Sequence, residues 1–439
     1  IILIILLIGV YYAYKFYQKN NFNDFVKSEL NLYTSEFTRN EDEKYSDKRS
    51  YKITSEEFND AMFYKTIKVT PNTPYKVTCM VKTKNVESEN NKKGAGAQIS
   101  IEGTTERSIA VEGTTDWKQI EFIFNSKNRE EVNLGFRLGG YVDNCKGEAW
   151  FSDFKLEEGI QDNSSEWKFA CLIFENTDVI VDGEEVKLNM TTTDITDISR
   201  TIDRFEDSCY DLSQGKMSAN CDIYRIQEPI NQLSYDEEFG YYVAPENVEE
   251  QISKIINSEN DYDHIFVIIR LGNDQYQDEI QIKDWIGLGA MDYYGIGFSN
   301  IRLPNNSNSY IYKYNTRINT FPEEVFLHEF LHSLERTAQE YGYKIPELHD
   351  YEKYGYENEP LEGQKKWYTD YMNKNIKAIT GNIGLPNEIY TLKPAKSSNF
   401  EYSYEIEEFT EPENIIEIIR EICSNIGGKI NTLLGGIEN

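Results

Sequence analysis

Histidine and cysteine are both scarce in this chain, with four histidines and six cysteines among 439 residues. No two cysteines form a CxxC pair, and none stands beside a histidine. A cysteine zinc knuckle is therefore excluded. Cys209 and Cys221 flank the turn-like stretch DLSQGKMSAN, so a disulfide between them outside the cell and two free buried thiols both remain open.

Basic residues are in the minority as well. Lys and Arg number 45 against 75 Asp and Glu, which gives a formal net charge of −30, and no basic stripe interrupts the acidic background. A nucleic-acid partner needs a basic face that releases counterions, so we expect no nucleic acid to bind. With 39% hydrophobic residues the chain can build real cores, and its length suggests two or three domains.

The N-terminal stretch IILIILLIGVYYAY starts at Ile1 rather than Met, which indicates a hydrophobic segment that is cut. We expect residues 1–20 to be a truncated single-pass transmembrane signal anchor and residues 21–29 a polar tether. The hydrophobic region of a cleaved signal peptide is the alternative, but no small-residue cleavage site follows.

Residues 30–158 show an apolar period of two, in runs such as YKVTCMVKT, KQIEFIF and VNLGFRL. This pattern predicts a β-sandwich. The landmarks SYKIT, VTPNTPYKVTCMVKT, GTTDWKQIEFIF and GEAWFSDFKLEEG appear in an order that resembles the jelly-roll carbohydrate-binding modules of bacterial glycan-degrading enzymes. The resemblance implies a glycan partner and, as a further cofactor, Ca²⁺ in the sandwich. For Trp117 and Trp150, core packing is favoured over contact with a sugar.

Beyond a boundary near residues 159–167, strands and helices alternate, which predicts an α/β or α+β domain over residues 165–400. The run TTDITDISRTIDRFEDSCYDL predicts a helix over residues 192–212. The continuous run HIFVIIRL predicts a fully buried strand, with His264 as a strand-end residue rather than a ligand. We expect residues 401–439 to be a tail that contains an amphipathic helix.

The run HEFLH, from His328 to His332, carries the chemistry of this domain. In a helix, two histidines at i and i+4 project from one face, as two ligands of a single zinc must. Glu329 then lies about 100° round the helix from His328, where its carboxylate can reach a reacting water. A capping box of Thr320 with Glu323 predicts the start of this helix, and Gly342 its end.

At this point the sequence resembles the zincin-type zinc metallopeptidases, over residues 165–400 loosely and over the histidine helix specifically. The upstream WIGLGAMDYYGIGFS resembles the edge strand that holds an extended substrate in such enzymes. The chain departs from the metzincin signature, which would place a histidine where this chain has Ala338.

The third zinc ligand has several candidates, of which His349 comes first. Neutral imidazole suits zinc, and only four histidines exist to be used. The helix climbs ~15 Å from His332 to Gly342, and the seven residues on to His349 can span ~23 Å, so the chain can return to the metal.

Two other kinds of third ligand remain open. Asp350 is favoured by HDYEKYG, which resembles the aspzincin motif with the spacing off by one. Glu335, one turn after His332, or a later acid such as Glu357 or Glu359, would match the usage of gluzincins.

Zinc hydrolysis combines a Lewis acid with a base that acts on one water, and Glu329 is the expected base. Tyr354 is the expected second donor to the oxyanion, because its phenol stays protonated at neutral pH. By resemblance to the metzincin Met-turn, Met372 is a candidate floor under the metal, although a core role is favoured.

The sequence thus predicts a multi-domain protein in which an all-β jelly roll that binds glycan precedes a zincin-like metallopeptidase domain. The protein would be tethered at the cell membrane or secreted, with an extracellular catalytic domain that cleaves proteins or glycoproteins. One rival is a non-catalytic surface adhesin that binds glycan and holds a structural zinc. The other is a glycosidase, for which no carboxylate pair stands out.

Overall fold

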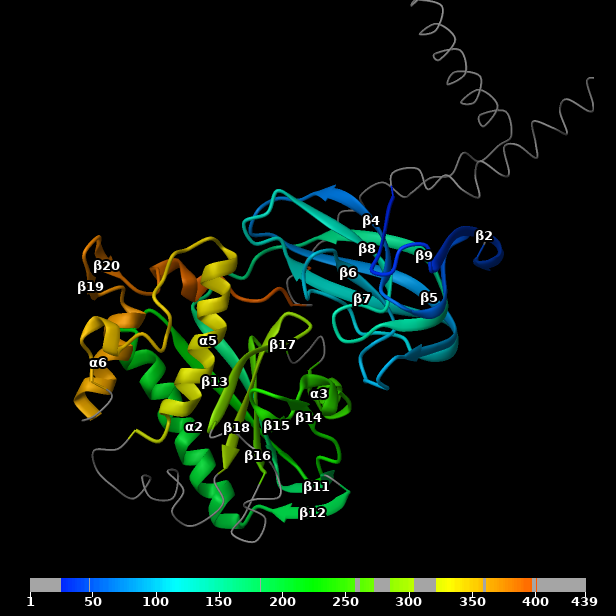
Figure 1. Ribbon diagram of the computed structural model, residues 1–439. Coiled ribbons are helices and arrows are strands. Elements are labelled where there is room, and N and C mark those ends of the chain that lie inside the picture. The colour runs from blue at the N-terminus through cyan, green and yellow to red at the C-terminus, as the bar shows by residue number, and fades with distance from the viewer. Residues whose placement is uncertain are drawn as a thin grey trace, which may run out of the picture.

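The computed structural model describes residues 25–46, 48–181, 183–256, 261–271, 285–303, 321–357, 361–396 and 400 (Figure 1). The membrane segment expected over residues 1–20, the first part of the tether and the tail over residues 401–439 lie outside these residues. No helix within the described part of the chain is long and apolar enough to span a membrane.

The N-terminal part is an antiparallel sandwich of two sheets. The first sheet has the order β1 (Val26–Glu29), β4 (Ala61–Lys68), β8 (Glu131–Leu138), β6 (Ala97–Ile101). The second has the order β2 (Ser35–Tyr45), β3 (Lys48–Asn59), β9 (Cys145–Glu158), β5 (Pro74–Ser88), β7 (Gly113–Asn125). Because β1 pairs with β4, the end of the expected tether at residues 26–29 is already part of the sandwich.

Alternation along the strands explains why these segments pair as sheets. In β5, Val77, Cys79 and Val81 are fully buried and face the core between the sheets, where Phe136 and Phe151 stack at 5.0 Å. A strand turns successive side chains to opposite faces, so a period of two puts one apolar face inside. The β-sandwich predicted from this period is confirmed.

The C-terminal part is built on a second five-stranded sheet, shown in green to yellow in Figure 1. Its order is β13 (Ser218–Ile226), β10 (Glu166–Phe174), β16 (His264–Arg270), β18 (Ile296–Leu303), β17 (Gly287–Tyr293). The first four strands run parallel, and β17 is antiparallel to β18 at the edge. The strand resembling a substrate-binding edge is thus an edge strand.

Layers cover both faces of this sheet. One face packs on α2 (Thr192–Leu212), α5 (Glu324–Glu340), α6 (Leu361–Met372) and η3 (Asn387–Thr391). The other packs on η1 (Pro245–Asn247), α3 (Glu249–Ile255) and the hairpins β11 (Asn176–Val181) with β12 (Glu184–Asn189) and β14 (Ser234–Asp236) with β15 (Gly240–Tyr242). The remaining elements are η2 (Glu352–Tyr354), β19 (Ile376–Ala378) and β20 (Gly381–Ile383).

Two predicted elements of this part are confirmed at residue level. Helix α2 spans residues 192–212 and is capped by Thr191 with Asp194. Strand β16 is buried along its whole length, because it lies between parallel neighbours in a sheet covered on both faces. His264 opens it and is fully buried, with its Nε2 3.0 Å from Ser299 Oγ.

Helix α5 ends as predicted but begins differently. Gly342 follows the helix at a φ of +82°, in the left-handed region that favours glycine. At the start, Glu323 is the N-cap and makes no side-chain cap bond; its carboxylate accepts from Arg204 at 2.8 Å and Ser208 at 3.1 Å. The predicted capping box is therefore wrong for Glu323, and Thr320 lies outside the described residues.

The two parts contact each other at the far end of α5. Tyr341 donates to Asn72 Oδ1 at 2.7 Å and to Asn125 Oδ1 at 3.1 Å. Lys127 pairs with Glu340 at 2.6 Å. The expected boundary near residues 159–167 also contacts the sandwich, since Gln161 accepts a hydrogen bond from Asn125 at 2.5 Å. The sandwich is thus docked on the second domain rather than loosely strung to it.

Candidate metal centre

Helix α5 places His328 and His332 at the rim of the core. Its apolar stripe of Leu327, Leu331 and Leu334 is fully buried against the sheet and α2. The side chains of the two histidines are only 19% and 18% exposed, on a neighbouring face of the helix. Apolar residues at helical spacing therefore dock the helix and leave the histidine face at the domain surface.

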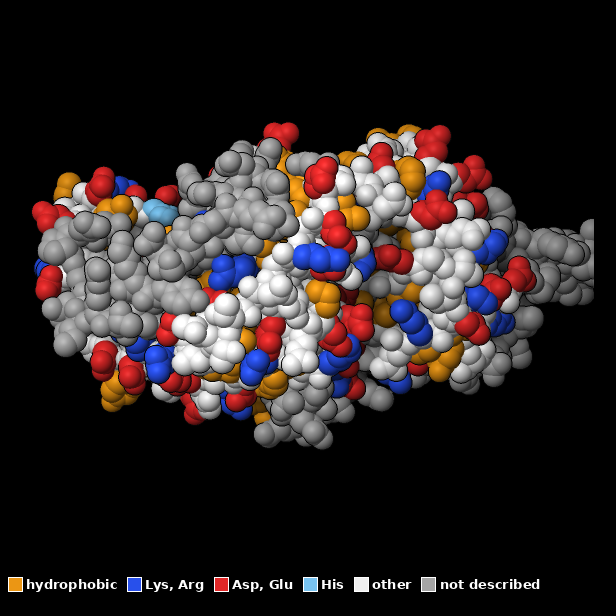
Figure 2. Space-filling view, turned by 90° about the horizontal axis from the view of Figure 1, so that it is seen from below, with side chains coloured by type: hydrophobic (Ala, Val, Ile, Leu, Met, Phe, Trp, Pro, Cys, Tyr) orange, Lys and Arg blue, Asp and Glu red, His pale blue; other side chains and the backbone are white. Residues whose placement is uncertain are grey.

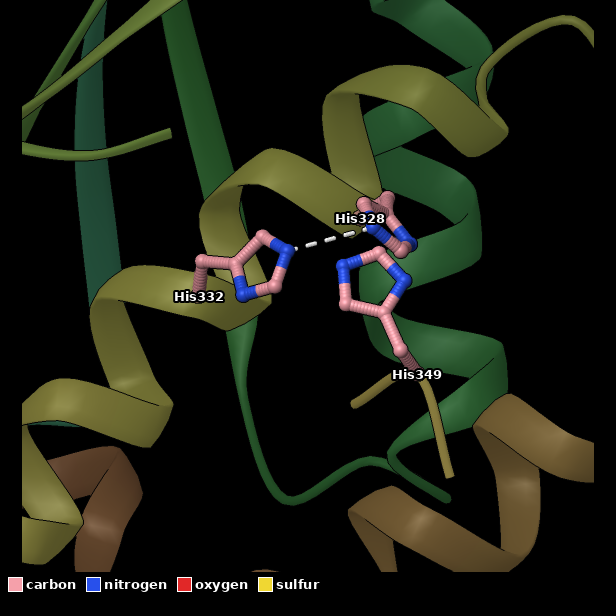
Figure 3. A group of neighbouring side chains, drawn as sticks. All are labelled: His328, His332 and His349. Atoms are coloured by element: carbon pink, nitrogen blue, oxygen red, sulfur yellow. Dashed lines mark hydrogen bonds between the residues drawn. The ribbon is translucent and has the colours of Figure 1, made fainter. Parts of the chain in front are cut away.

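The structure brings three histidines together (Figure 3). His328 Nε2 and His332 Nε2 are 3.2 Å apart, and each of the three residues offers a ring nitrogen within 4.8 Å of the other two. Two nitrogens bound to one tetrahedral zinc at ~2.0–2.1 Å would lie about 3.3 Å apart. The spacing of the helix pair fits this donor geometry.

The other ring nitrogen of each helix histidine has its own partner. His328 Nδ1 lies 2.9 Å from the Tyr368 hydroxyl, which in turn donates to Glu324 Oε1. His332 Nδ1 lies 3.0 Å from Glu335 Oε2. A proton on Nδ1, held by an acceptor, leaves the Nε2 lone pair free for a metal. The two partners therefore select the tautomer that a ligand needs.

The pKa values of His328 and His349 are both lowered, which favours their neutral imidazoles. Burial, and then the neighbouring His332 and His349, lower the pKa of His328 to about 3. Burial followed by His332 also lowers the pKa of His349, although Glu335 and Glu347 act in the opposite direction. A metal binds only deprotonated nitrogen, so these two shifts favour the form of His328 and His349 that a metal ligand needs.

His349 reaches the cluster from the loop that follows α5. Its exposed ring lies 4.8 Å from that of His328 and 5.0 Å from that of His332, centroid to centroid. The residue before it, Leu348, is buried, and both its backbone N–H and its backbone carbonyl make hydrogen bonds. Its N–H donates to Glu335 Oε1 at 3.0 Å, and its carbonyl accepts from Trp367 Nε1 at 3.0 Å.

The other candidate third ligands lie elsewhere. Glu335 holds His332 and Leu348, so both of its oxygens are engaged behind the histidines. Asp350 accepts from Lys353 at 2.6 Å. Glu357 is outside the cluster of ligand atoms, and Glu359 lies outside the described residues. Of the candidates that can be located, His349 is the one that joins the helix pair.

Glu329 is buried between α5 and the edge strand β17. A Cβ on Gly287 would stand 2.3 Å from Glu329 Oε1, and one on Gly289 would stand 2.7 Å from Oε2. The carboxylate therefore lies directly on the backbone of two glycines. Burial, and then the charge of Glu324, raise the pKa of Glu329 to about 8, while a hydrogen bond from the Gly289 backbone opposes the rise.

Tyr354 and Met372 have packing roles in the structure. The Tyr354 ring stacks on Trp367 with 6.5 Å between centroids, and Lys353 Nζ lies 5.4 Å from the centroid of the Tyr354 ring. No described contact joins Tyr354 to the histidines. Met372 is fully buried in the core formed with α6.

Sequence reasoning missed Tyr368 and Glu324. Glu324 precedes His328 by four residues on the same helix, so its proximity could have been found from spacing. Tyr368 is 40 residues from His328, on α6, and no local pattern marks it. Within the described part of the chain, the three histidines are the single group of three or more His, Cys, Asp or Glu side chains placed to hold a metal ion. The Ca²⁺ expected in the sandwich stays a prediction.

Trp150 is buried and Trp117 is half-buried, and neither belongs to the cluster between the two sheets. In β9, Ala149 and Phe151 face that core, so Trp150 lies on the outer face; it is 5% exposed, with Lys52 Nζ 4.7 Å from its ring. Trp117 is half-buried and its ring is 5.9 Å from that of Tyr45. Trp150 is thus buried as expected, although on the outer face of the sheet, whereas the expected core packing is wrong for the half-buried Trp117.

Comparison with known proteins gives no family for the chain. No family model matches, and no curated protein matches. Similar solved structures include TmCBM61 in complex with beta-1,4-galactotriose, at 16% identity and a TM-score of 0.23, covering 32% of this chain and 92% of that one. A CBM22-2 xylan-binding domain from Paenibacillus barcinonensis Xyn10C matches at 9% identity and a TM-score of 0.24, covering 32% and 94%. Scores this low carry no argument, so the sandwich fold rests on the strand pairing described above.

Proposed function

We propose that the second domain is a zinc-dependent peptidase of the zincin type. The observation that carries this proposal is the convergence of His328, His332 and His349, with the Nδ1 atoms of the helix pair held by acceptors. Three imidazoles suit zinc and leave a fourth tetrahedral position for the reaction. Glu329, on the same helix, supplies a carboxylate beside an edge strand.

Bound zinc would supply a Lewis acid that lowers the pKa of water toward ~7. The Glu329 carboxylate then accepts the proton of the attacking water and passes it to the leaving amine. This carboxylate lies against the backbone of the strand that would hold the peptide. An extended peptide can pair with β17, whose outer edge has no strand partner among the described residues.

Hydrolysis and metal content test this proposal together. The purified chain is expected to bind one zinc per molecule and to cleave an unstructured protein, with activity lost on chelation and restored by zinc. A chain that binds zinc stoichiometrically and cleaves nothing would favour the adhesin with a structural zinc.

Ligand identity is tested by two neighbouring substitutions. His349→Ala is expected to weaken zinc binding much more than Asp350→Ala, since the first removes a ligand and the second removes the partner of Lys353. Competition with a chelator of known affinity measures both. Zinc loss in Asp350→Ala with retention in His349→Ala would replace the three-histidine site by an aspzincin-like one.

We also propose that the sandwich binds glycan, and this second proposal rests on a separate observation. The outer face of the β2-β3-β9-β5-β7 sheet carries Trp117 beside Tyr45, with the ion pair Lys82–Glu43 at 2.9 Å nearby. Aromatic rings can stack on a sugar, and charged groups beside them can hydrogen-bond its hydroxyls.

On a glycan array, Trp117→Ala is expected to reduce binding. Tyr141→Ala, which removes a separate exposed ring, is expected to leave binding unchanged. Equal binding by both variants would refute this face as the site.

Surface tethering completes the proposed function. A membrane anchor at residues 1–20 would place the peptidase outside the cell, where glycoprotein substrates can meet both domains. Two binding domains on one chain raise the effective concentration of the enzyme at such a target.

A further inference from the structure

Glu335 joins two parts of the histidine cluster that come from different elements. One carboxylate oxygen lies 3.0 Å from His332 Nδ1, and the other accepts from the Leu348 N–H at 3.0 Å. Three residues separate Glu335 from His332 on α5, a spacing at which helical side chains meet. Leu348 is 13 residues further along and directly precedes His349.

The three histidines differ in what orients them. His328 is held by the Tyr368 hydroxyl, which is backed by Glu324. His332 is held by Glu335 alone among the contacts found at its Nδ1. For the His349 imidazole, the described part of the chain provides no hydrogen-bond partner, so its place depends on the backbone of the loop. That backbone is fixed at Leu348, by Glu335 on one side and Trp367 on the other.

Burial makes these two bonds matter. Glu335 is 9% exposed, Leu348 1% and Trp367 3%. A buried carboxylate is costly unless both oxygens are satisfied, and a buried N–H likewise needs its acceptor. The Glu335 carboxylate meets both needs while it points the Nε2 lone pair of His332 away from itself and toward His328.

We propose that Glu335 is a positioning residue shared by two ligands. Its one carboxylate fixes both the tautomer of His332 and the backbone of the loop that carries His349. The proposal rests on the zinc site described under the proposed function, and it makes two of the three ligands depend on a residue that does not touch the metal. An isolated orienting residue would act on one ligand only.

Glu335→Gln separates the two bonds with almost no change in shape. The amide has one acceptor oxygen and one NH₂, so it cannot accept from both the Leu348 N–H and the His332 Nδ1–H. Whichever bond survives, the other is lost. Glu347→Gln is the matched control, because Glu347 is exposed, contributes charge at His349 and lies two residues before it.

The experiment measures zinc affinity by chelator competition and the visible absorption of the cobalt-substituted full chain. Glu335→Gln is expected to weaken zinc binding by about 10–100-fold, the typical cost of losing a partner behind a ligand, and to shift the cobalt spectrum. Glu347→Gln should bind zinc within about threefold of the parent, since only exposed charge is removed, and its cobalt spectrum should overlay that of the parent.

A double-mutant cycle tests the sharing. In a His349→Ala background, Glu335→Gln should cost less zinc affinity than in the parent, because the loop it held no longer carries a ligand. An equal cost in both backgrounds would overturn the shared role, and a Glu335→Gln protein that behaves like Glu347→Gln would overturn the positioning role altogether. Either result leaves the proposed function intact if the parent binds zinc, whereas a parent without zinc binding refutes the proposed function itself.

Discussion

Glu329 combines burial with a neighbouring negative charge, which raises its pKa to about 8. A zinc ion held by the neighbouring histidines would favour its ionised form, which is the form that accepts a proton. Glu329 shares no hydrogen bond with the histidines, so removing its charge need not disturb them.

We therefore expect Glu329→Gln to bind zinc as the parent does and to lose at least ~10² in the rate of peptide hydrolysis, the scale of a positioned general base. Zinc content and hydrolysis rate on the same preparation measure both. The isosteric amide keeps the fold, so a zinc-loaded variant with the parental rate would rule out this base.

His264 gives a pH prediction away from the proposed zinc site. Burial, and then the charge of Arg336, lower its pKa to about 3. In the unfolded chain the imidazole binds a proton below pH ~6.5. Between pH 6.5 and 3 the unfolded state thus binds more protons than the folded state, so acid removes stability over this range.

His264→Gln removes this titration and keeps a polar side chain beside Ser299. As the pH falls from 6.5 toward 3, the unfolding free energy of the parent should decrease more steeply than that of the variant. The difference in unfolding free energy between the two proteins should therefore become smaller. Denaturant midpoints at four pH values measure it. A difference that is constant across the range would show that His264 does not titrate on unfolding.

Individual residues differ in how far the sequence could predict them. The spacing of His328 and His332 already places both on one face, and chain reach admits His349 as the third member. Tyr368 could not be predicted, because its place beside His328 depends on how α6 packs. Glu335 was a candidate from helical spacing, but its role behind the ligand depends on where Leu348 lies in space.

At the scale of elements, α5 and β17 form one unit around Glu329. Two glycines on the strand, Gly287 and Gly289, allow the carboxylate to lie on the backbone. In Gly287→Ala, the new Cβ would meet Glu329 Oε1 at 2.3 Å, so the carboxylate must move. A displacement near 1 Å can cost about 10²-fold in rate.

We expect Gly287→Ala to keep zinc and to lose about 10–100-fold in hydrolysis rate, as measured by kcat/KM on an unstructured substrate. Leu288→Ala is the control, since Leu288 packs against the core on the opposite side of the sheet. That variant should lose stability and retain most of the rate. Similar rates for both would show that the glycine does not position the base.

Secondary structure was predictable where one physical cause dominates. The unbroken apolar run of β16 and the capped, amphipathic α2 carry their own signals. The start of α5 does not, because Glu323 finds Arg204 and Ser208 on α2 instead of the local backbone. The half-buried position of Trp117 was not predicted for a similar reason, since strand alternation assigns a side chain to a face of the sheet but does not tell which face is covered.

At the scale of the molecule, the sandwich contacts η1, the turn after β17 and the end of α5. Arg107 pairs with Glu246 at 2.8 Å and lies 5.8 Å from the ring of Tyr294, in the turn after β17. Lys127 and Tyr341 join it to the end of α5. Figure 2 shows acidic and basic side chains interspersed over the described part of this face of the molecule. The sandwich is therefore held against the second domain at two places, near β17 and at the end of α5.

Tyr341 tests whether this docking contributes to stability. Its hydroxyl donates to Asn72 at 2.7 Å and Asn125 at 3.1 Å, so Tyr341→Phe removes the donor to two amide oxygens at the junction. We expect a loss of about 1–2 kcal/mol in unfolding free energy. Tyr343→Phe is the control, because Tyr343 is two residues away and 36% exposed, and this variant should unfold as the parent does.

A tightly docked sandwich should also unfold together with the second domain, in one calorimetric transition. Two separate transitions, with Tyr341→Phe no less stable than Tyr343→Phe, would show instead that the sandwich is an independent module whose contacts with α5 add nothing to the fold.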